Sequence, residues 1–370
     1  MGKCRICGDY SPVISSNLGV CIRCLRENPK DALNVAAEAH AEARRSFGLP
    51  ENPPRDEDGI ECGMCANNCR IGVGRKGFCG LVVNENGRLI RLGGTVDKGI
   101  LEWYYDPLPT NCVAEWFCPG CTGAGYPKYA YMPSAEHGYV NLAVFYGACS
   151  FDCLFCQNWH YKEMTVKLRP RISAQELASK ANEKVSCICF FGGDPSVQMP
   201  HAIGASRTAL ENAGDENRIL RICWETNGNL EWNFAKEAAE LSLQSGGIVK
   251  FDIKAWDDNI HRALCGVSNE ATLRNFRMIG ERYFEERSEV PLLTASTLLV
   301  PGYVDAKEVE MIAKFIADIS PKIPYSLLAF YPQFRLNDLP TTSRRQALEC
   351  FRAAKRYLEN VWIGNIHLLS

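Results

Sequence analysis

Residues 139–159 read YVNLAVFYGACSFDCLFCQNW, and the rest of the architecture can be worked out from this stretch. It begins as an apolar run typical of a buried β-strand and ends in a loop that carries Cys149, Cys153 and Cys156 in the spacing C-x3-C-x2-C. Cluster irons normally take one protein thiolate each, so three thiolates on one loop suit a four-iron cluster whose fourth iron is left open. The alternatives are a zinc loop or three unrelated cysteines, and the place of the motif directly after a strand argues against both.

After residue 139, short apolar runs alternate with amphipathic stretches, which is the signature of β/α units around a parallel sheet. Six runs are predicted to be strands: 139–147, 186–193, 218–228, 247–255, 292–302 and 324–332. Five stretches are predicted to be helical: 173–184, 233–244, 272–286, 306–320 and 343–360. Six units are two short of a closed eightfold barrel. The sequence therefore predicts an α/β protein with an open, partial (β/α)6 TIM-like barrel, whose chemistry lies at the carboxyl ends of the strands.

The composition indicates a soluble enzyme-sized chain and excludes several classes. The 370 residues leave room for one catalytic domain and a smaller module. The formal net charge of −2 gives no electrostatic reason to expect nucleic acid or an anionic membrane as partner. No apolar run approaches the length of a membrane span, and the amino terminus lacks the apolar stretch of a signal peptide. We therefore expect a cytoplasmic protein, in which 19 cysteines indicate metal or redox chemistry.

The chain divides into four parts. Residues 1–27 form a zinc-ribbon-like module that is too small to hold a core without a metal, and residues 28–59 form a helix, starting at Pro29, and a polar linker. Residues 60–135 form a Cys-rich leader, expected to be rich in loops, and residues 136–370 form the barrel.

The remaining cysteines fall into sets with different expectations. Cys4, Cys7, Cys21 and Cys24, as C-x2-C-x13-C-x2-C, predict a structural zinc site. Cys62, Cys65, Cys69 and Cys79 suit zinc or an auxiliary iron–sulfur cluster equally well, because thiolate sets of this size accept either. Cys112, Cys118 and Cys121 are only three, so they borrow a ligand, leave a site open or bind nothing. Cys187, Cys189 and Cys223 lie on predicted buried strands and are interpreted as small hydrophobic residues.

The Cys149–Cys156 motif, with the aromatic Phe155 before its last cysteine, resembles that of the radical S-adenosylmethionine (SAM) superfamily, and the resemblance covers residues 139 to about 365. In that superfamily the open iron of a 4Fe–4S cluster chelates the methionine amino and carboxylate groups of SAM. One electron then cleaves SAM to methionine and a 5′-deoxyadenosyl radical, which abstracts hydrogen from a substrate. The resemblance implies an anaerobic enzyme and a low-potential electron donor, a ferredoxin or a flavodoxin.

Several strand ends resemble the same superfamily. Gly192, Gly193 and Asp194 resemble the GGE loop that receives the methionine ammonium, with Asp in place of the usual Glu. Glu225 and Thr226, and then Asp252 and Lys254, resemble the DTNG and DLK segments of pyruvate formate-lyase activating enzymes. The implied roles are polar contacts to the methionine moiety, with Lys254 pairing with its carboxylate. An ordinary ion pair at the barrel mouth is the alternative for Asp252 and Lys254.

Three further residues have implied roles next to the nucleoside. Phe155 is expected near the adenine, and Val300 ends the fifth strand in a Pro-Gly loop that lets the backbone approach the ligand. Tyr331 lies where AmmeMemoRadiSam-type enzymes carry His, in FYPQFRLNDLPTT, and VWIGN near the carboxyl terminus resembles the same enzymes.

Three hypotheses for the function follow. A glycyl-radical activase is favoured by the barrel-end motifs, whereas the leader and carboxyl terminus favour a radical enzyme that acts on a small molecule or on a protein side chain. A non-catalytic metal-binding scaffold would have no need for polar motifs at consecutive strand ends. For the enzyme, we expect residues 60–135 to cover the barrel mouth, with Tyr331 and Arg335 reaching into the substrate site.

Overall fold

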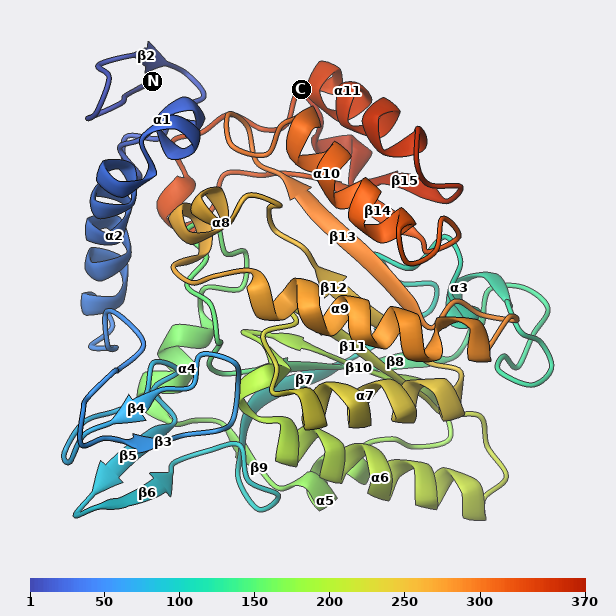
Figure 1. Ribbon diagram of the computed structural model, residues 1–370. Helices are drawn as coiled ribbons and strands as arrows, with labels where there is room; N and C mark the ends of the chain where they lie inside the picture. The colour runs from blue at the N-terminus through green and yellow to red at the C-terminus, as the bar shows by residue number, and fades with distance from the viewer.

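The computed structural model describes residues 1–370 and has a curved nine-stranded sheet at its centre, in the order β15-β14-β13-β12-β11-β10-β8-β7-β9 (Figure 1). Its strands are β7 (Gly99–Pro107), β8 (Val140–Tyr146), β9 (Arg171–Ile172), β10 (Val185–Gly192), β11 (Arg221–Thr226), β12 (Val249–Asp252), β13 (Leu293–Leu299), β14 (Tyr325–Ala329) and β15 (Val361–Gly364). β8 and the strands from β10 to β15 pair in parallel, and β7 pairs antiparallel with β8 and β9. The predicted α/β class with a mostly parallel sheet is confirmed.

The six predicted strands are β8 and β10 to β14, and the sheet extends beyond them at both edges. β15 adds a seventh parallel strand next to β14. On the other side, β7 pairs with the whole length of β8, from Leu101 opposite Tyr146 to Pro107 opposite Val140. β7 belongs to the leader, where only loops were expected. It covers an edge that would otherwise leave backbone groups of β8 unpaired.

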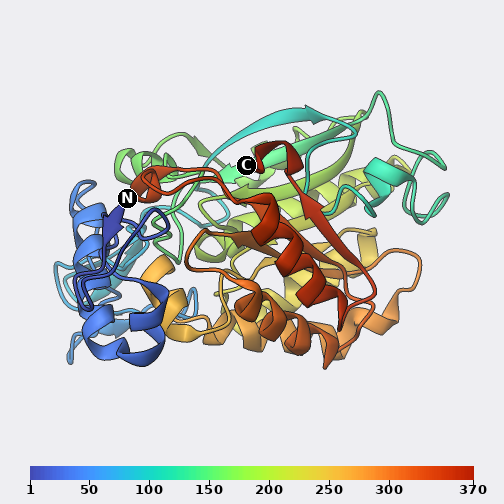
Figure 2. The same ribbon diagram turned by 90° about the horizontal axis from the view of Figure 1, so that it is seen from above.

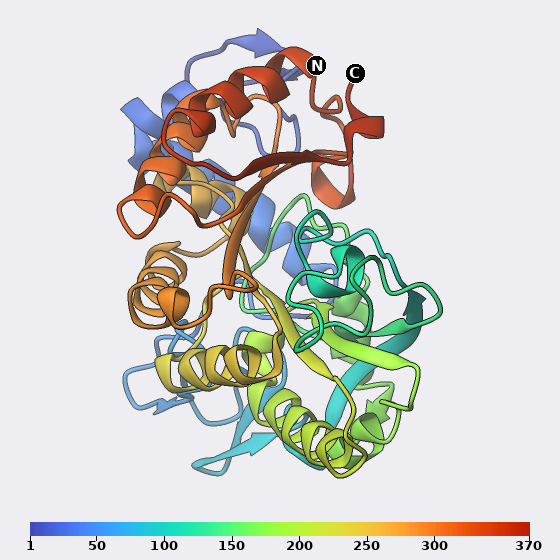
Figure 3. The ribbon, with the colours of Figure 1, turned by 90° about the vertical axis from the view of Figure 1, so that its right-hand side faces the viewer.

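Helices cover the outer face of the sheet (Figures 1 and 3). They are α4 (Tyr161–Lys167), α5 (Ala174–Ala178), α6 (Met199–Asp215), α7 (Trp232–Ser245), α8 (Asp258–Cys265), α9 (Glu270–Tyr283), α10 (Ala306–Ala317) and α11 (Arg344–Lys355). Of these helices, α4, α6 and α8 were not predicted from the sequence. None of the helices combines the length and apolar character that crossing a bilayer requires.

The amino-terminal segment packs against the barrel beside the carboxyl ends of the strands (Figure 2). It contains β1 (Gly2–Lys3), β2 (Tyr10–Ser11), α1 (Ile22–Glu27) and α2 (Pro29–Arg45). Arg26 pairs with Asp305 at 2.9 Å and with Glu308 at 3.0 Å, and the Tyr303 hydroxyl donates to the Val20 carbonyl at 2.8 Å. These contacts attach the small module to the start of α10.

The Cys-rich leader is divided between the two ends of the barrel. Its first part holds the hairpins β3 (Ile60–Glu61) with β4 (Arg70–Ile71) and β5 (Val82–Glu85) with β6 (Arg88–Arg91), and it lies at the carboxyl ends, where Ala66 N–H donates to the Asn229 carbonyl just after β11. Residues 108–138, with α3 (Pro119–Thr122), lie at the opposite end, where Glu136 pairs with Arg221 at the start of β11. Figure 1 shows these two parts on opposite sides of the sheet.

Candidate active site

The C-x3-C-x2-C loop leaves the carboxyl end of β8 and is held against α8 by backbone hydrogen bonds. Asp152 N–H donates to the Cys265 carbonyl at 2.9 Å, and Leu154 N–H donates to the Leu264 carbonyl at 3.0 Å. This contact brings a further thiol to the loop, because the sulfur of Cys265 lies 3.5 Å from that of Cys153.

A cavity opens beside this loop, and residues from five parallel strands or their following loops complete its wall. It is lined by Cys149, Phe151, Cys153, Phe155, Cys156, Gln157, Asn158, Tyr161, Phe191, Gly192, Gly193, Asp194, Glu225, Asn227, Asp252, Lys254, Leu298 and Leu328. The structure therefore brings together the three loop cysteines and seven of the ten residues with an implied cofactor contact. The place is the one where barrel chemistry is expected.

Three residues with an implied cofactor contact lie outside the cavity wall. Thr226 is buried and donates to Asp194 at 3.1 Å. Val300 is fully buried in the core, and its N–H donates to the Leu298 carbonyl in a tight turn. Tyr331 is 47% exposed, and Leu328 of β14 lines the cavity from that strand instead.

The leader and Arg335 were also expected to contribute to the substrate site, and they too lie outside the cavity wall. No residue of the range 60–135 lines the cavity. Arg335 points to α2, where it pairs with Glu42 at 3.3 Å and donates to the Ser46 hydroxyl at 3.2 Å. Its position follows from the backbone of its own turn, since Arg335 N–H donates to the Leu154 carbonyl.

Gly192 and Gly193 are required by a close approach of two loops. A Cβ atom at Gly192 would lie 2.1 Å from the Tyr146 nitrogen, and one at Gly193 would lie 2.0 Å from the Ala148 carbonyl oxygen. Gly192 also has a positive φ of 106°, which L side chains rarely adopt. The two glycines therefore let the carboxyl end of β10 pack directly against the start of the cysteine loop.

Asp194 connects the carboxyl ends of β10 and β11 through hydrogen bonds. Its carboxylate accepts from Asn227 N–H at 2.6 Å, from Ser196 N–H at 2.8 Å and from the Thr226 hydroxyl. Burial raises the pKa of Asp194 to about 6 despite these donors. With its oxygens already hydrogen-bonded within the chain, Asp194 is suited to positioning the two loops.

Glu225 differs from Asp194 because one of its oxygens is free. Its Oε2 atom is buried and accepts no hydrogen bond, and the nearest cation, Lys250, is 3.7 Å away. Burial raises the pKa of Glu225 to about 8. An unsatisfied carboxylate oxygen in a cavity wall fits a ligand that brings its own donor, such as an ammonium group.

Asp252 and Lys254 form an ion pair on the same wall. Lys254 Nζ lies 2.6 Å from Asp252 Oδ2, and Asp252 Oδ1 accepts from the Ser296 hydroxyl. The same ammonium lies 5.9 Å from the centre of the Phe155 ring. The cavity thus offers a carboxyl group at Glu225, which a bound ammonium would help to ionise, and an ammonium at Lys254, and this pair complements an amino acid moiety.

A buried charge cluster under the cysteine loop had no sequence signal, because its members are up to 122 positions apart. Asp152, which is inaccessible to solvent, pairs with Lys162, with His40 Nδ1 at 2.9 Å and with Arg44 Nη1 at 3.4 Å. Burial alone would raise the pKa of Asp152, but Lys162 and His40 hold it well below its usual range. The cluster fastens the cysteine loop to α2 and α4.

Asn227 is a site residue to which no role was assigned from the sequence, although it directly follows Glu225 and Thr226. Its side-chain amide donates to the Ser150 hydroxyl at 2.9 Å and lies 3.5 Å from the Cys149 sulfur. The leader reaches the same loop through Asn67, whose amide donates to the Ser150 carbonyl at 2.6 Å. The backbone and first thiol of the cysteine loop are therefore held from two directions.

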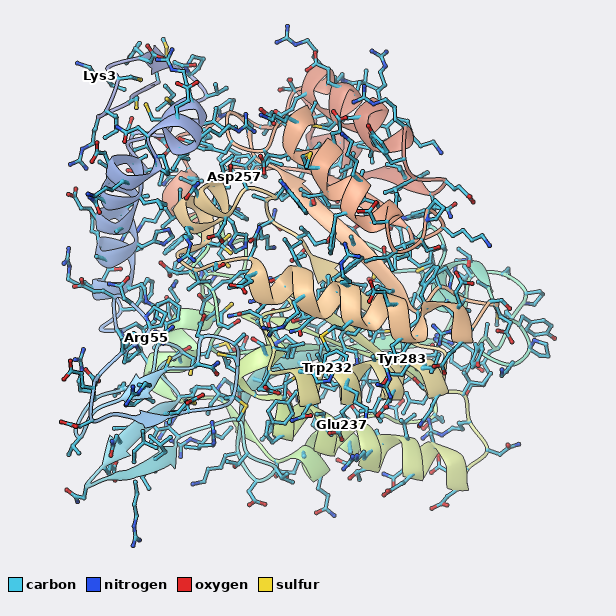
Figure 4. The ribbon with its side chains drawn as sticks, in the orientation of Figure 1. Lys3, Arg55, Trp232, Glu237, Asp257 and Tyr283 are labelled. Carbon is cyan, nitrogen blue, oxygen red and sulfur yellow. The ribbon has the colours of Figure 1, made fainter.

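The amino-terminal thiols are arranged for a single tetrahedral ion. The sulfur atoms of Cys4, Cys7, Cys21 and Cys24 all lie within 4.8 Å of one another, with 3.7 Å between Cys4 and Cys24 and 3.8 Å between Cys7 and Cys21. Four sulfurs at ~2.3 Å from one zinc ion would be ~3.8 Å apart, so this set fits zinc. Figure 4 shows the sulfur atoms gathered near the labelled Lys3.

The second thiol set lies in the part of the leader that packs on the active-site face. Burial raises the pKa of the Cys65 thiol, and the thiols of Cys79, Cys69 and Cys62 raise it further. A polar cleft separates part of the linker and leader from the barrel, and two of its lining residues, Arg55 of the linker and Trp232 of α7, are labelled in Figure 4.

Comparisons with known proteins agree with this geometry. Residues 143–316 match the Radical SAM superfamily. An uncharacterized protein of Methanocaldococcus jannaschii is 26% identical over 84% of this chain and 83% of its own length. A second protein of that organism, named for glycyl-radical enzyme activation, is 26% identical over 58% of this chain and 76% of its own length. The isethionate sulfite-lyase activating enzyme of Desulfovibrio desulfuricans is 33% identical over 44% of this chain and 46% of its own length.

The barrel, the cysteine loop and these matches define a radical SAM domain over residues 143–316, and the chain is an enzyme. Within that superfamily it is similar to the glycyl-radical activating enzymes.

Proposed function

We propose that this enzyme binds a 4Fe–4S cluster through Cys149, Cys153 and Cys156, cleaves SAM reductively and removes a hydrogen atom from a substrate. The observation that carries the proposal is that three thiols, an unsatisfied carboxylate and an ammonium group face one cavity at the strand ends. When bound, the cluster would supply the electron for SAM cleavage through the iron that no thiolate holds. A ferredoxin or a flavodoxin is the proposed electron donor.

The residues of the cavity divide into ligand-binding and positioning groups. Glu225 is the proposed acceptor for the methionine ammonium, because its free oxygen lacks a donor. Lys254 is the proposed partner of the methionine carboxylate and would exchange its contact with Asp252 for it. Phe155 lies in the wall as the proposed neighbour of the adenine, and Asp194 keeps the loops of β10 and β11 in register.

The proposed substrate is a small molecule or a protein side chain. The relative that spans most of this chain, including the leader, has no assigned activity, so it does not narrow the choice. Activation of a glycyl-radical enzyme is the second candidate, and it is supported by the names of two relatives that match the barrel region.

The cluster assignment is tested by electron paramagnetic resonance. Anaerobically reconstituted and reduced protein should show a 4Fe–4S signal that SAM perturbs. In the variant Cys149→Ala/Cys153→Ala/Cys156→Ala that perturbation should be lost, whereas Cys350→Ala, which changes a buried thiol of α11 that does not line the cavity, should keep it. Persistence of the SAM effect in the triple variant would show that the assignment is wrong.

The substrate class is tested by isotope transfer. The enzyme is incubated anaerobically with SAM, reductant and an extract from cells grown in deuterated medium, separated into protein and dialysable fractions. Deuterium in 5′-deoxyadenosine that depends on the protein fraction would support activase-type chemistry, and dependence on the dialysable fraction would support a small-molecule substrate. Absence of SAM cleavage under every condition would contradict the proposed function.

A further inference from the structure

Residues 108–138 close the amino end of the barrel and bring their three cysteines to the cysteines of two barrel strands. Cys112 and Cys118 line a small cavity together with Cys187 and Cys189 of β10 and Cys223 of β11. Cys121 lies one helical turn from Cys118, with its sulfur 3.7 Å from the Thr110 carbonyl oxygen. Five of the nineteen cysteines therefore line one cavity, with Cys121 beside it, and none of the six belongs to a metal site assigned above.

Lys250 of β12 lies among these thiols. Its Nζ atom is 3.1 Å from the sulfur of Cys112 and 2.8 Å from that of Cys189. The side chain is 2% exposed, and its only carboxylate partner, Glu225, is 3.7 Å away. A buried cation needs a nearby negative charge, and metal-bound thiolates would provide it, whereas neutral thiols that only fill a core would not.

The spacing of the thiols favours a multi-iron group over a single ion. No three of the six sulfur atoms lie within 4.8 Å of one another, in contrast to the compact set of Cys4, Cys7, Cys21 and Cys24. The cysteines of the proposed radical SAM cluster, Cys149, Cys153 and Cys156, are likewise not gathered within that limit. A tetrahedral zinc ion requires the compact arrangement, and an iron–sulfur cluster accepts the wider one.

The segment that supplies the loop thiols is held in place by a buried ion pair. Glu136 accepts from Arg221 Nη1 at 2.9 Å and from Nη2 at 2.7 Å, and Arg221 also donates to the Tyr129 carbonyl at 2.8 Å. Both charged side chains are almost inaccessible to solvent. The thiols of the loop are thus presented to the strands by a fixed framework.

We propose that this cavity binds a second iron–sulfur cluster, whose ligands come jointly from the 108–138 segment and from the inward-facing cysteines of β10 and β11. The site adjoins the radical SAM cavity, since Phe191 lines both cavities and Lys250 lies between them. The inference is independent of the activity proposed above, because it concerns ligands that the radical SAM loop does not use.

The test starts from the full chain with Cys149→Ala/Cys153→Ala/Cys156→Ala, so that failure of the first cluster assignment cannot be confused with failure of this one. In that background two pairs are replaced separately, Cys112→Ala/Cys118→Ala and Cys187→Ala/Cys189→Ala, with Cys350→Ala as the matched control. Iron, acid-labile sulfide and zinc are counted per chain after anaerobic reconstitution, and circular dichroism checks the fold.

Each pair should lower iron and sulfide by about four per chain, and combining the pairs should lower them no further, because both sets hold one cluster. Unchanged iron in both pairs, an effect of only one pair, or a second zinc per chain, beyond the one expected at the amino-terminal thiols, in place of iron would overturn the proposal. Where a thiol pair fails to fold, Lys250→Gln in the same triple background gives a second readout. Loss of the ammonium should lower the midpoint potential of the remaining cluster signal, and an unaltered potential would also overturn the proposal.

Discussion

The Nζ atom of Lys250 lies 3.7 Å from Oε2 of Glu225, and this ammonium separates the two cavities inside the barrel. The layering follows from strand geometry, because alternate residues of a strand point to the same face. Cys223 of β11 lines the cavity of the clustered cysteines. Glu225 of β11 and Asn227, which follows the strand, line the active-site cavity. One strand therefore contributes to both proposed sites.

Replacing Glu225 by Gln should weaken SAM binding roughly 10- to 100-fold, because a hydrogen bond to a charged group contributes about 1.5–3 kcal/mol. The measurement is equilibrium dialysis with reconstituted protein. Glu231→Gln is the matched control, since that carboxylate lies on the same loop but caps α7 and does not line the cavity. If Glu225→Gln keeps full affinity while Asp194→Asn loses it, the ammonium binds to Asp194 and not to Glu225.

Replacing Asp152 by Asn should lower the free energy of unfolding by about 3–5 kcal/mol, because it leaves the buried Lys162 without its counter-charge. Urea unfolding of the metal-free protein measures the change. The control is Glu163→Gln on the same helix, where the exposed pair with Lys167 contributes only about 0.3–0.5 kcal/mol. Equal destabilisation by the two substitutions would show that the cluster around Asp152 does not hold the loop.

The barrel and its mouth could be predicted because their signals are local. Each parallel strand is a short apolar run followed by a polar motif, and neighbouring strands bring Gly193, Glu225 and Asp252 to one edge. β15 escaped prediction because four residues are too few to show a period. β7 escaped because its outer half is exposed and carries aromatic and charged residues inside a Cys-rich stretch.

Long-range contacts account for what the sequence could not indicate. Cys187, Cys189 and Cys223 look like ordinary small core residues until the 108–138 segment is placed against them. Asp152 looks like a loop residue, and only the packing of α2 gives it His40 and Arg44 as partners. In both cases the chemistry depends on a pairing of residues that the chain separates by more than 60 positions.

The stability of the enzyme should fall in mild acid because of His201. Its ring is buried, with Nδ1 2.8 Å from the Tyr146 hydroxyl and Nε2 3.0 Å from the Ile172 carbonyl, and burial lowers its pKa to about 4. The unfolded chain, with a pKa of about 6.5, binds the proton first. The contribution is therefore fully present above about pH 6.5 and is lost as the pH falls toward 4, by about 3 kcal/mol in total. Denaturant unfolding across this range should show a smaller slope for His201→Gln than for the unaltered protein, and equal slopes would contradict the assignment.

The amino-terminal module should contribute to folding and not to catalysis. Replacing Cys4 and Cys24 by Ser should remove about one zinc per chain, because the compact set of four thiols is broken, and should leave the rate of 5′-deoxyadenosine formation unchanged. A closed four-thiolate site has no open position for a reactant, and no residue of 1–27 lines the active-site cavity. The substitution is preferable to deletion of the module, since deletion would expose the buried Tyr303 and remove the hydrogen bonds from Ser15 and Ser16 to Asp338. Zinc is measured by mass spectrometry and 5′-deoxyadenosine by chromatography, with Cys350→Ser as control. Loss of SAM cleavage with an unchanged circular dichroism spectrum would assign the module a role in the reaction.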